Sequence, residues 1–286
     1  MKIVSFNDVN ICTESFGSEH NPAILLIMGA ASSMIWWENE FCERLAAKGF
    51  YVIRYDNRDT GKSTNYPLGQ PGYTFEDLAD DAVHVMDAYK IQKAIIMGMS
   101  MGGMLTQMIA LRHPERVAGI VLLASMYFAD GAENLPYSSD EVNTFFEQMA
   151  KSEPPKDADG LVEVAIQQWR ITNQSKRPHD ENHIRKMNRL DIERSNNFDC
   201  RMNHSYAQVT GDELGRIAEI AVPTLVIHGT EDVVIPYIHG EMLAKTISNA
   251  ILLPLDGAGH ELHPLDYDRV IEAICQRFVD RSENMV

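Results

Sequence analysis

Gly98-Met99-Ser100-Met101-Gly102 is the stretch that decides the fold, because it fits the pattern G-x-S-x-G. An apolar run, 94–97, precedes it, and apolar residues at helical spacing, 104–109, follow it. A serine on a sharp strand-to-helix turn holds its hydroxyl out of the sheet, and small flanking residues let neighbouring backbone pass close by. The alternative is a glycine-rich structural turn whose serine only caps the helix. We favour a nucleophile because the rest of the chain supplies its partners.

A nucleophilic serine needs a base and an orienting acid, which follow it in this architecture in the order Ser, Asp, His. The apolar run 224–229 leads into a turn that carries Asp232. A second run, 251–255, leads into a glycine-bracketed loop that carries His260. Both lie just past the carboxyl end of a predicted strand, where open α/β sheets place their sites. We therefore predict a catalytic triad of Ser100, Asp232 and His260.

Four nearby side chains compete for these roles. Glu231 adjoins Asp232, but successive residues point apart, and we favour Asp232 as the partner of the imidazole. We expect Asp256 to bracket the glycine turn, His263 to pack at the entry to the last helix, and His228 to be a satisfied structural histidine. The remaining histidines (20, 84, 113, 179, 183, 204 and 239) have no partner pattern. No H-E-x-x-H or Cys/His ligand spacing appears, so no metal site is expected.

Backbone amides are expected to form the oxyanion hole. One is the amide of Met101, which follows the nucleophile at the start of the helix. The second has to come from the loop after an early strand, and residues 23–28 read as that strand. Gly29 permits the turn, so the N–H of Ala30 is the natural second donor.

The chain resembles an α/β-hydrolase-fold serine hydrolase over nearly its whole length, and its pattern is most similar to the aclacinomycin methylesterase group of carboxylic ester hydrolases. The segments that carry this resemblance are 26–29, 52–63, 98–102, 169–171 and 222–227. It implies the same triad and oxyanion donors and requires no cofactor. Met28-Gly29 stands where many relatives have His-Gly, and Asp59 replaces the first glycine of the common Asp-x-Arg-Gly-x-Gly turn.

Strands and helices alternate along the chain in the way that builds a parallel sheet. The alternation stops between residues 127 and 215, where only helical patterns occur, and this interval is too long for a loop. We therefore predict a mostly parallel, eight-stranded α/β-hydrolase sheet flanked by helices, with a helical cap inserted after strand 6. The predicted core comprises residues 1–126 and 216–286, and the predicted cap comprises residues 127–215.

Substrate choice is expected to lie in the cap, because the triad chemistry discriminates little between leaving groups. The candidate pocket residues are Met28, Trp37, Phe146 and Trp169, with Trp36, Phe145 and Met149 as further candidates. For each of them, packing in the cap or core is the competing interpretation. We expect Arg58, in the turn after strand 50–55, to be a buried structural ion-pair partner.

The composition of the chain limits the kinds of partner that it is expected to have. The 286 residues are 45% hydrophobic and can bury a full core. The formal charge of −16 disfavours nucleic acid and anionic membranes as partners. No apolar run reaches the about 18 residues of a membrane span, and no signal-peptide pattern appears. The four cysteines lack paired spacing, which suggests reduced thiols in a cytoplasmic protein.

These observations predict hydrolysis of a small-molecule carboxylic ester through an acyl-enzyme. The same triad would also suit a cofactor-free perhydrolase or a carbon–carbon bond hydrolase. A small-molecule receptor of this fold is the alternative from another class, and turnover on an activated ester would distinguish it. Dehalogenases and epoxide hydrolases are disfavoured, because they place aspartate at the position of Ser100. The oligomeric state stays open.

Overall fold

The computed structural model, which describes residues 1–279, is built on one eight-stranded sheet. Its strands are β1 (Lys2–Phe6), β2 (Val9–Phe16), β3 (Ala23–Ile27), β4 (Tyr51–Tyr55), β5 (Ala94–Met99), β6 (Val117–Leu123), β7 (Thr224–Gly229) and β8 (Ala250–Leu255). They lie in the order β1-β2-β4-β3-β5-β6-β7-β8. The strands β1 and β2 run antiparallel to their neighbours, and all other pairs are parallel. The carboxyl ends of β3 and β5 to β8 therefore meet at one edge.

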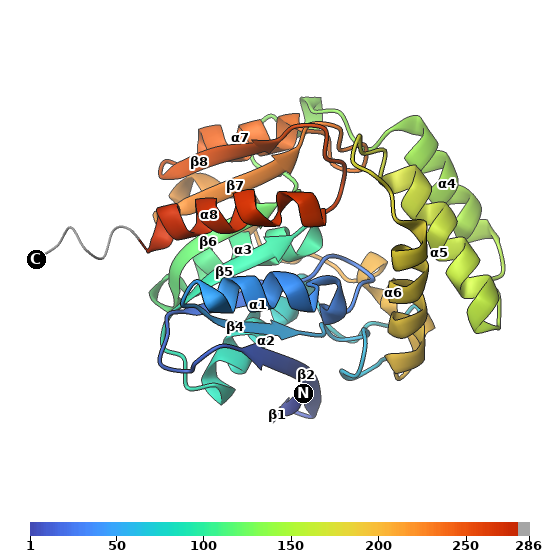
Figure 1. Ribbon diagram of the computed structural model, residues 1–286, viewed down its shortest axis with the longest axis horizontal. Helices are drawn as coiled ribbons and strands as arrows, with labels where there is room; N and C mark the ends of the chain where they lie inside the picture. Colours follow the sequence, from blue (N-terminus) through green and yellow to red (C-terminus); the bar gives the residue numbers. More distant parts are fainter. Residues whose placement is uncertain (280–286) are drawn as a thin grey trace, which may run out of the picture.

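Helices cover both faces of the sheet (Figure 1). One face packs against α1 (Asn39–Ala47) and α8 (Tyr267–Phe278). The other packs against α2 (Phe75–Ala88), α3 (Met101–Arg112) and α7 (Ile238–Thr246). Strand β3 has a continuous apolar run because it is buried on both faces. Leu25 and Ile27 belong to the core under α2 and α3, whereas Ile24 and Leu26 belong to the core under α1 and α8. A strand buried on both faces has no polar side.

Between β6 and β7 the chain forms α4 (Asp140–Lys151), α5 (Ala158–Thr172) and α6 (Glu181–Arg194), which lie together at one end of the sheet (Figure 1). A 3-10 helix, η4 (Phe198–Ser205), follows them. Within 127–215, all of which the structure describes, there is no strand. The predicted fold class is thereby confirmed, including the helical insertion after the sixth strand.

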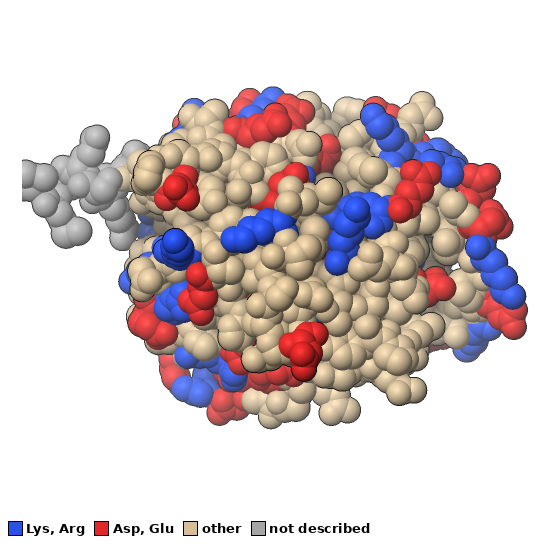
Figure 2. Space-filling view, turned by 90° about the horizontal axis from the view of Figure 1, so that it is seen from below, with Lys and Arg blue, Asp and Glu red and all other residues tan. Residues whose placement is uncertain are grey.

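Exposed ion pairs join α5 and α6 at the surface. Arg185 pairs with Glu163 of α5, and Arg189 lies within ion-pair distance of Asp159. Figure 2 shows acidic and basic side chains side by side at this end of the molecule. Exposed pairs of this kind contribute little stability, about 0–1 kcal/mol each. The two helices are held mainly by apolar packing, with Ile166 fully buried.

Two further properties bear on the sequence predictions. No helix within residues 1–279 is both long enough and apolar enough to cross a membrane. Cys12, Cys42 and Cys200 are buried thiols, and burial raises the pKa of Cys42 to about 12. The Cys42 thiol is therefore protonated at neutral pH.

Candidate active site

Ser100 lies on the turn between β5 and α3, as the sequence pattern predicts. Its backbone has φ 54° and ψ −119°, a conformation that L-residues other than glycine rarely adopt and that costs roughly 1–3 kcal/mol. A methyl group at Gly98 would overlap the carbonyl oxygen of Gly102, and one at Gly102 would overlap that of Ile27 in β3. The two glycines thus allow the strained turn to sit tightly between neighbouring strands. Ser100 itself is half-buried.

Asp232 and His260 are joined by a hydrogen bond of 2.8 Å between Oδ2 and Nδ1. Asp232 is buried, and its Oδ1 accepts the backbone N–H groups of Val234 and Ile235 at 2.9 and 2.8 Å. Burial by itself raises the pKa of Asp232. The charge of His260 and the hydrogen bonds from His228 and His260 outweigh burial and hold that pKa well below its usual range. The carboxylate therefore stays ionised at neutral pH.

The competing side chains lie elsewhere. Glu231 points to Lys176, with 2.6 Å between carboxylate and ammonium. His263 contacts the carbonyl oxygen of Pro178 at 3.1 Å and caps the short helix before α8. Asp256 is exposed. The structure thus brings Asp232 and His260 together, and their catalytic roles stay predictions.

His228 departs from the expectation of a fully satisfied histidine. Its Nε2–H donates to the carbonyl oxygen of Ile235 at 2.8 Å and lies 3.4 Å from Oδ2 of Asp232. Its buried Nδ1, however, has no hydrogen-bond partner within the described part of the chain. The backbone of α7 closes off this side, because a methyl group at Gly240 would lie 2.8 Å from Nδ1. The expectation is therefore wrong for Nδ1, where the close approach of a glycine excludes a partner.

Ser100 and His260 line one cavity of about 690 Å³, hereafter the Ser100 cavity. Among residues 1–279 no hydrogen bond to the Ser100 hydroxyl is formed, so His260 and Ser100 share the cavity without being bonded. Catalytic hydrogen bonds are often loose until substrate is bound. The role of Ser100 as nucleophile stays a prediction.

The loop after β3 passes directly beside Ser100. A methyl group at Gly29 would lie 3.2 Å from Cβ of Ser100, and Ala30 and Ala31 line the Ser100 cavity. Within the described residues, neither the N–H of Ala30 nor that of Met101 has a hydrogen-bond acceptor. Both predicted oxyanion donors are therefore available for a ligand, and their roles stay predictions.

His204 of η4 holds this loop, a role that the sequence analysis missed. Its Nδ1 accepts the N–H of Ala31 at 3.0 Å, and its Nε2–H donates to the carbonyl oxygen of Arg58 at 2.8 Å. Burial lowers the pKa of His204, although the Arg58 carbonyl and the charge of Asp59 oppose that shift. The ring is therefore neutral and able to accept. It occupies the N–H of Ala31 and leaves the neighbouring N–H of Ala30 without a partner.

Asp59 explains the departure from the glycine-containing turn. Its φ is +66°, a region that aspartate tolerates better than most residues. Its buried Oδ2 accepts hydrogen bonds from Asn203 of η4 at 3.0 Å and from Tyr73 at 2.8 Å. The Asp59 side chain thus connects the turn after β4 to η4, the helix that carries His204, and a glycine could not make this contact.

Two residues of α6 reach the same region. Asp191 is buried and accepts hydrogen bonds from the Ser33 hydroxyl and from Nε1 of Trp36, the latter at 2.9 Å. Arg194 binds both oxygens of Asp56 at 2.9 and 2.8 Å. No sequence pattern marks these contacts, because they join segments more than 130 residues apart.

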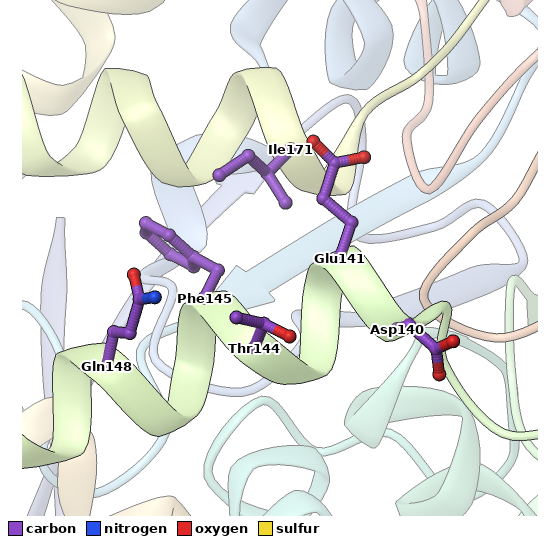
Figure 3. A pocket seen from close by; sticks show the side chains of 6 residues that line it. All are labelled: Asp140, Glu141, Thr144, Phe145, Gln148 and Ile171. Carbon is purple, nitrogen blue, oxygen red and sulfur yellow. The ribbon is translucent and has the colours of Figure 1, made fainter.

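All four predicted pocket residues, Met28, Trp37, Phe146 and Trp169, line the Ser100 cavity, as does Trp36. Phe145 does not. It lies in a separate hollow of about 320 Å³ between α4 and α5, where it faces Ile171 (Figure 3). Adjacent helical residues point about 100° apart, so only one of the two phenylalanines can face the cavity.

The structural role expected for Arg58 can be compared directly with the structure. Arg58 forms a buried, two-pronged ion pair with Asp81, with both contacts at 2.7 Å, which agrees with its predicted structural role. In the part of the chain that the structure describes, no group of three or more histidine, cysteine or acidic side chains could hold a metal ion.

Comparison with known proteins gives a consistent result. Residues 22–267 match the sequence profile of the family described as alpha/beta hydrolase fold. Rhodomycin D methylesterase DauP of a Streptomyces species is 30% identical over 290 residues, with 96% of each chain covered. The methylesterase DnrP of Streptomyces peucetius is 28% identical over the same length and coverage. The crystal structure of the enol-lactonase from Burkholderia xenovorans superimposes with a TM-score of 0.75 at 25% identity, covering 96% of this chain and 98% of that one.

Proposed function

Since the chain belongs to the alpha/beta hydrolase family, we propose that it cleaves its substrate through an acyl-enzyme formed on Ser100. The family match, together with the likeness to two methylesterases over nearly their whole length, makes the chain a carboxylic ester hydrolase. The observation that best supports the mechanism is the Asp232–His260 hydrogen bond beside the cavity that Ser100 also lines.

In the first half-reaction the Ser100 oxygen attacks the carbonyl carbon of the ester, and Nε2 of His260 takes the hydroxyl proton. The Asp232 carboxylate accepts the Nδ1–H and so keeps Nε2 free to act as the base. The N–H groups of Ala30 and Met101 donate to the developing oxyanion, an interaction worth about 3–4 kcal/mol per donor. His260 then protonates the leaving alcohol oxygen as the ester C–O bond breaks.

In the second half-reaction water replaces the alcohol. His260 removes a proton from that water, whose oxygen attacks the acyl carbonyl carbon. Collapse of the second tetrahedral intermediate breaks the bond to the Ser100 oxygen, which takes the proton back from His260. The carboxylic acid leaves, and the chain's own residues supply every proton transfer without a cofactor.

The relatives also suggest the leaving group. Because DauP and DnrP are methylesterases, we propose a small alcohol such as methanol on that side of the ester. The Ser100 cavity, at about 690 Å³, can hold a far larger acid portion. Phe146 and Trp169 line it from α4 and α5, which supports the predicted role of residues 127–215 as a cap that selects the acid portion.

Replacing Ser100 by Ala tests this proposal. The variant should lose hydrolysis of para-nitrophenyl acetate and of methyl esters while keeping the circular dichroism spectrum of the folded protein. A sulfonyl fluoride should label Ser100 alone, as read by peptide mass spectrometry. Ser32, the other serine that lines the cavity, provides the matched control, and Ser32→Ala should retain both turnover and labelling. Robust turnover by Ser100→Ala, or label on Ser32, would refute the assignment.

A further inference from the structure

Arg201 lines the Ser100 cavity with its charge unpaired. Within residues 1–279 no carboxylate lies at ion-pair distance from its guanidinium. Its Nε is buried and has no hydrogen-bond partner. Within the described residues, the polar contact of this side chain is from Nη1 to the Met202 sulfur at 3.9 Å, and thioether sulfur is a weak acceptor. The guanidinium therefore has hydrogen-bond donors without acceptors in the described protein, and it belongs to a side chain that lines a cavity.

Burial without a partner is costly for a charged group, and arginine does not escape that cost by losing its proton. Arg194, whose side chain is only 9% exposed, satisfies its charge by binding both oxygens of Asp56. For Arg201, burial lowers the pKa while the charges of Asp191 and Asp199 oppose that shift, so these carboxylates act only from a distance.

Of the five acidic side chains that line the cavity, Asp191 is the one whose charge acts on Arg201, and it is already engaged. Both oxygens of Asp191 accept hydrogen bonds, one from the Ser33 hydroxyl and the other from Nε1 of Trp36. Each Asp191 oxygen thus has a donor of its own, and neither is within ion-pair distance of Arg201 among the described residues. Arg201 is therefore left with unfilled donors on a side chain that lines the Ser100 cavity.

The helix η4 sets where Arg201 stands. In a 3-10 helix, residues three apart lie above one another, so Phe198, Arg201 and His204 share one face. The Phe198 ring supports the guanidinium from 4.0 Å. His204 contacts Ala31 in the loop beside Ser100, and three residues of a 3-10 helix span about 6 Å. Arg201 is therefore one helical turn from His204, the residue that contacts the predicted oxyanion loop.

We propose that Arg201 binds a second, anionic carboxylate on the acid portion of the substrate, so that the enzyme acts on monoesters of dicarboxylic acids. This substrate class rests on the proposed function of Ser100. The terminal nitrogens of a guanidinium match the two oxygens of a carboxylate, and stacking on Phe198 fixes the plane in which they bind. Ester carbonyl and carboxylate would then occupy opposite ends of one bound molecule.

The test compares two series of methyl esters that differ only at the far end of the acid portion. One series ends in a carboxylate and the other in a methyl group, and each varies the number of methylene groups between the ends. Wild-type enzyme should prefer the carboxylated ester at one spacer length, with acid release followed in a pH-stat. Arg201→Met should lower kcat/KM for that ester by about 10- to 100-fold, as expected for lost hydrogen bonds between charged groups. Its effect on the neutral ester should be far smaller.

Arg201→Lys keeps the charge without the planar fork and should fall between wild type and Arg201→Met. Arg185→Met removes an arginine of α6 that pairs with Glu163 and Glu181 and does not line the cavity, and it should retain the preference. Equal loss on both esters, or a wild-type enzyme without preference at any spacer length, would overturn the proposal.

Two further measurements test the Arg201 subsite even if the Arg201→Met variant does not fold or the proposed role of Ser100 is wrong. If Arg201→Met does not fold, inhibition of the wild-type enzyme decides, since a dicarboxylate should compete better than a monocarboxylate of equal length. The Ser100→Ala protein should bind the carboxylated ester without hydrolysing it, and the additional change Arg201→Met should weaken that binding in a thermal-shift titration. Hydrolysis by Ser100→Ala would refute the mechanism alone, whereas equal binding with and without Arg201 would refute the subsite alone.

Discussion

Exchange of Asp232 for Asn tests the base assignment most sharply, because the structure determines how the amide must orient. Oδ1 of Asp232 accepts the N–H groups of Val234 and Ile235, so the amide oxygen of Asn has to take that position. The amide –NH₂ then faces Nδ1 of His260. A hydrogen on Nδ1 would clash with it, so His260 must carry its proton on Nε2 instead.

An Nε2–H cannot accept the Ser100 proton, and the variant therefore holds the wrong tautomer with little change in shape. In a serine protease the equivalent exchange lowers kcat about 10⁴-fold, which corresponds to roughly 5.5 kcal/mol of transition-state stabilisation. We expect a loss of that order here, because the contacts of Asp232 leave the amide no other orientation.

The assay is kcat on a para-nitrophenyl ester and on a methyl ester, with the thermal midpoint measured in parallel. Glu231→Gln makes the same chemical change one residue away, at a side chain that pairs with Lys176, and it should change kcat little. The pKa of Asp232 is lowered in the folded state, so its contribution to stability is present above about pH 4 and is lost only in stronger acid. A loss of less than tenfold in Asp232→Asn, or an equal loss in Glu231→Gln, would refute the reasoning.

Two further predictions concern the segment between β6 and β7. His204→Ala should lower kcat on every ester, because it strips Ala31 and Arg58 of their partners, and His204→Asn should lose less, since its Oδ1 can replace Nδ1. The pKa of His204 is lowered in the folded state, so the unfolded chain binds a proton first; the free energy of unfolding should fall below about pH 6.5, with a shallower decline in His204→Asn. Trp169→Ala should alter KM and the ranking of esters, at a cost of about 1–3 kcal/mol in kcat/KM. Phe145→Ala, in the separate hollow, is its control, and an equal kcat loss on all esters in Trp169→Ala would contradict a specificity role.

The sequence predicts well what depends on local pattern and on the parallel sheet. Ser100, Asp232 and His260 each follow an apolar run, and runs of this kind become neighbouring parallel strands whose carboxyl ends share one edge. Loops 130 residues apart are thus predicted to meet without knowledge of any side-chain contact. The choice between Asp232 and Glu231 also depends on a local rule, that successive residues point apart.

Polar contacts between distant segments lie beyond such patterns. His204 and Asp191 carry no signal in the sequence, because hydrophobic periodicity shows which helix face is buried and not which acceptor a buried polar group meets. The same limit explains Phe145 and Phe146. Both fit an apolar helix face, and only the rotation of α4 about its axis decides which ring lines the Ser100 cavity.

We infer from these contacts a second role for the segment between β6 and β7. The sequence analysis gave it substrate choice alone, because the triad chemistry discriminates little between leaving groups. His204 and Asp191 instead hold residues 31–36, the continuation of the loop that carries the predicted oxyanion donor Ala30. A donor amide acts through its position, so an error of about 1 Å can cost about a hundredfold in rate. We therefore expect selectivity and catalytic geometry to be coupled in this chain, so that a substitution in the cap that moves η4 or α6 changes kcat as well as KM.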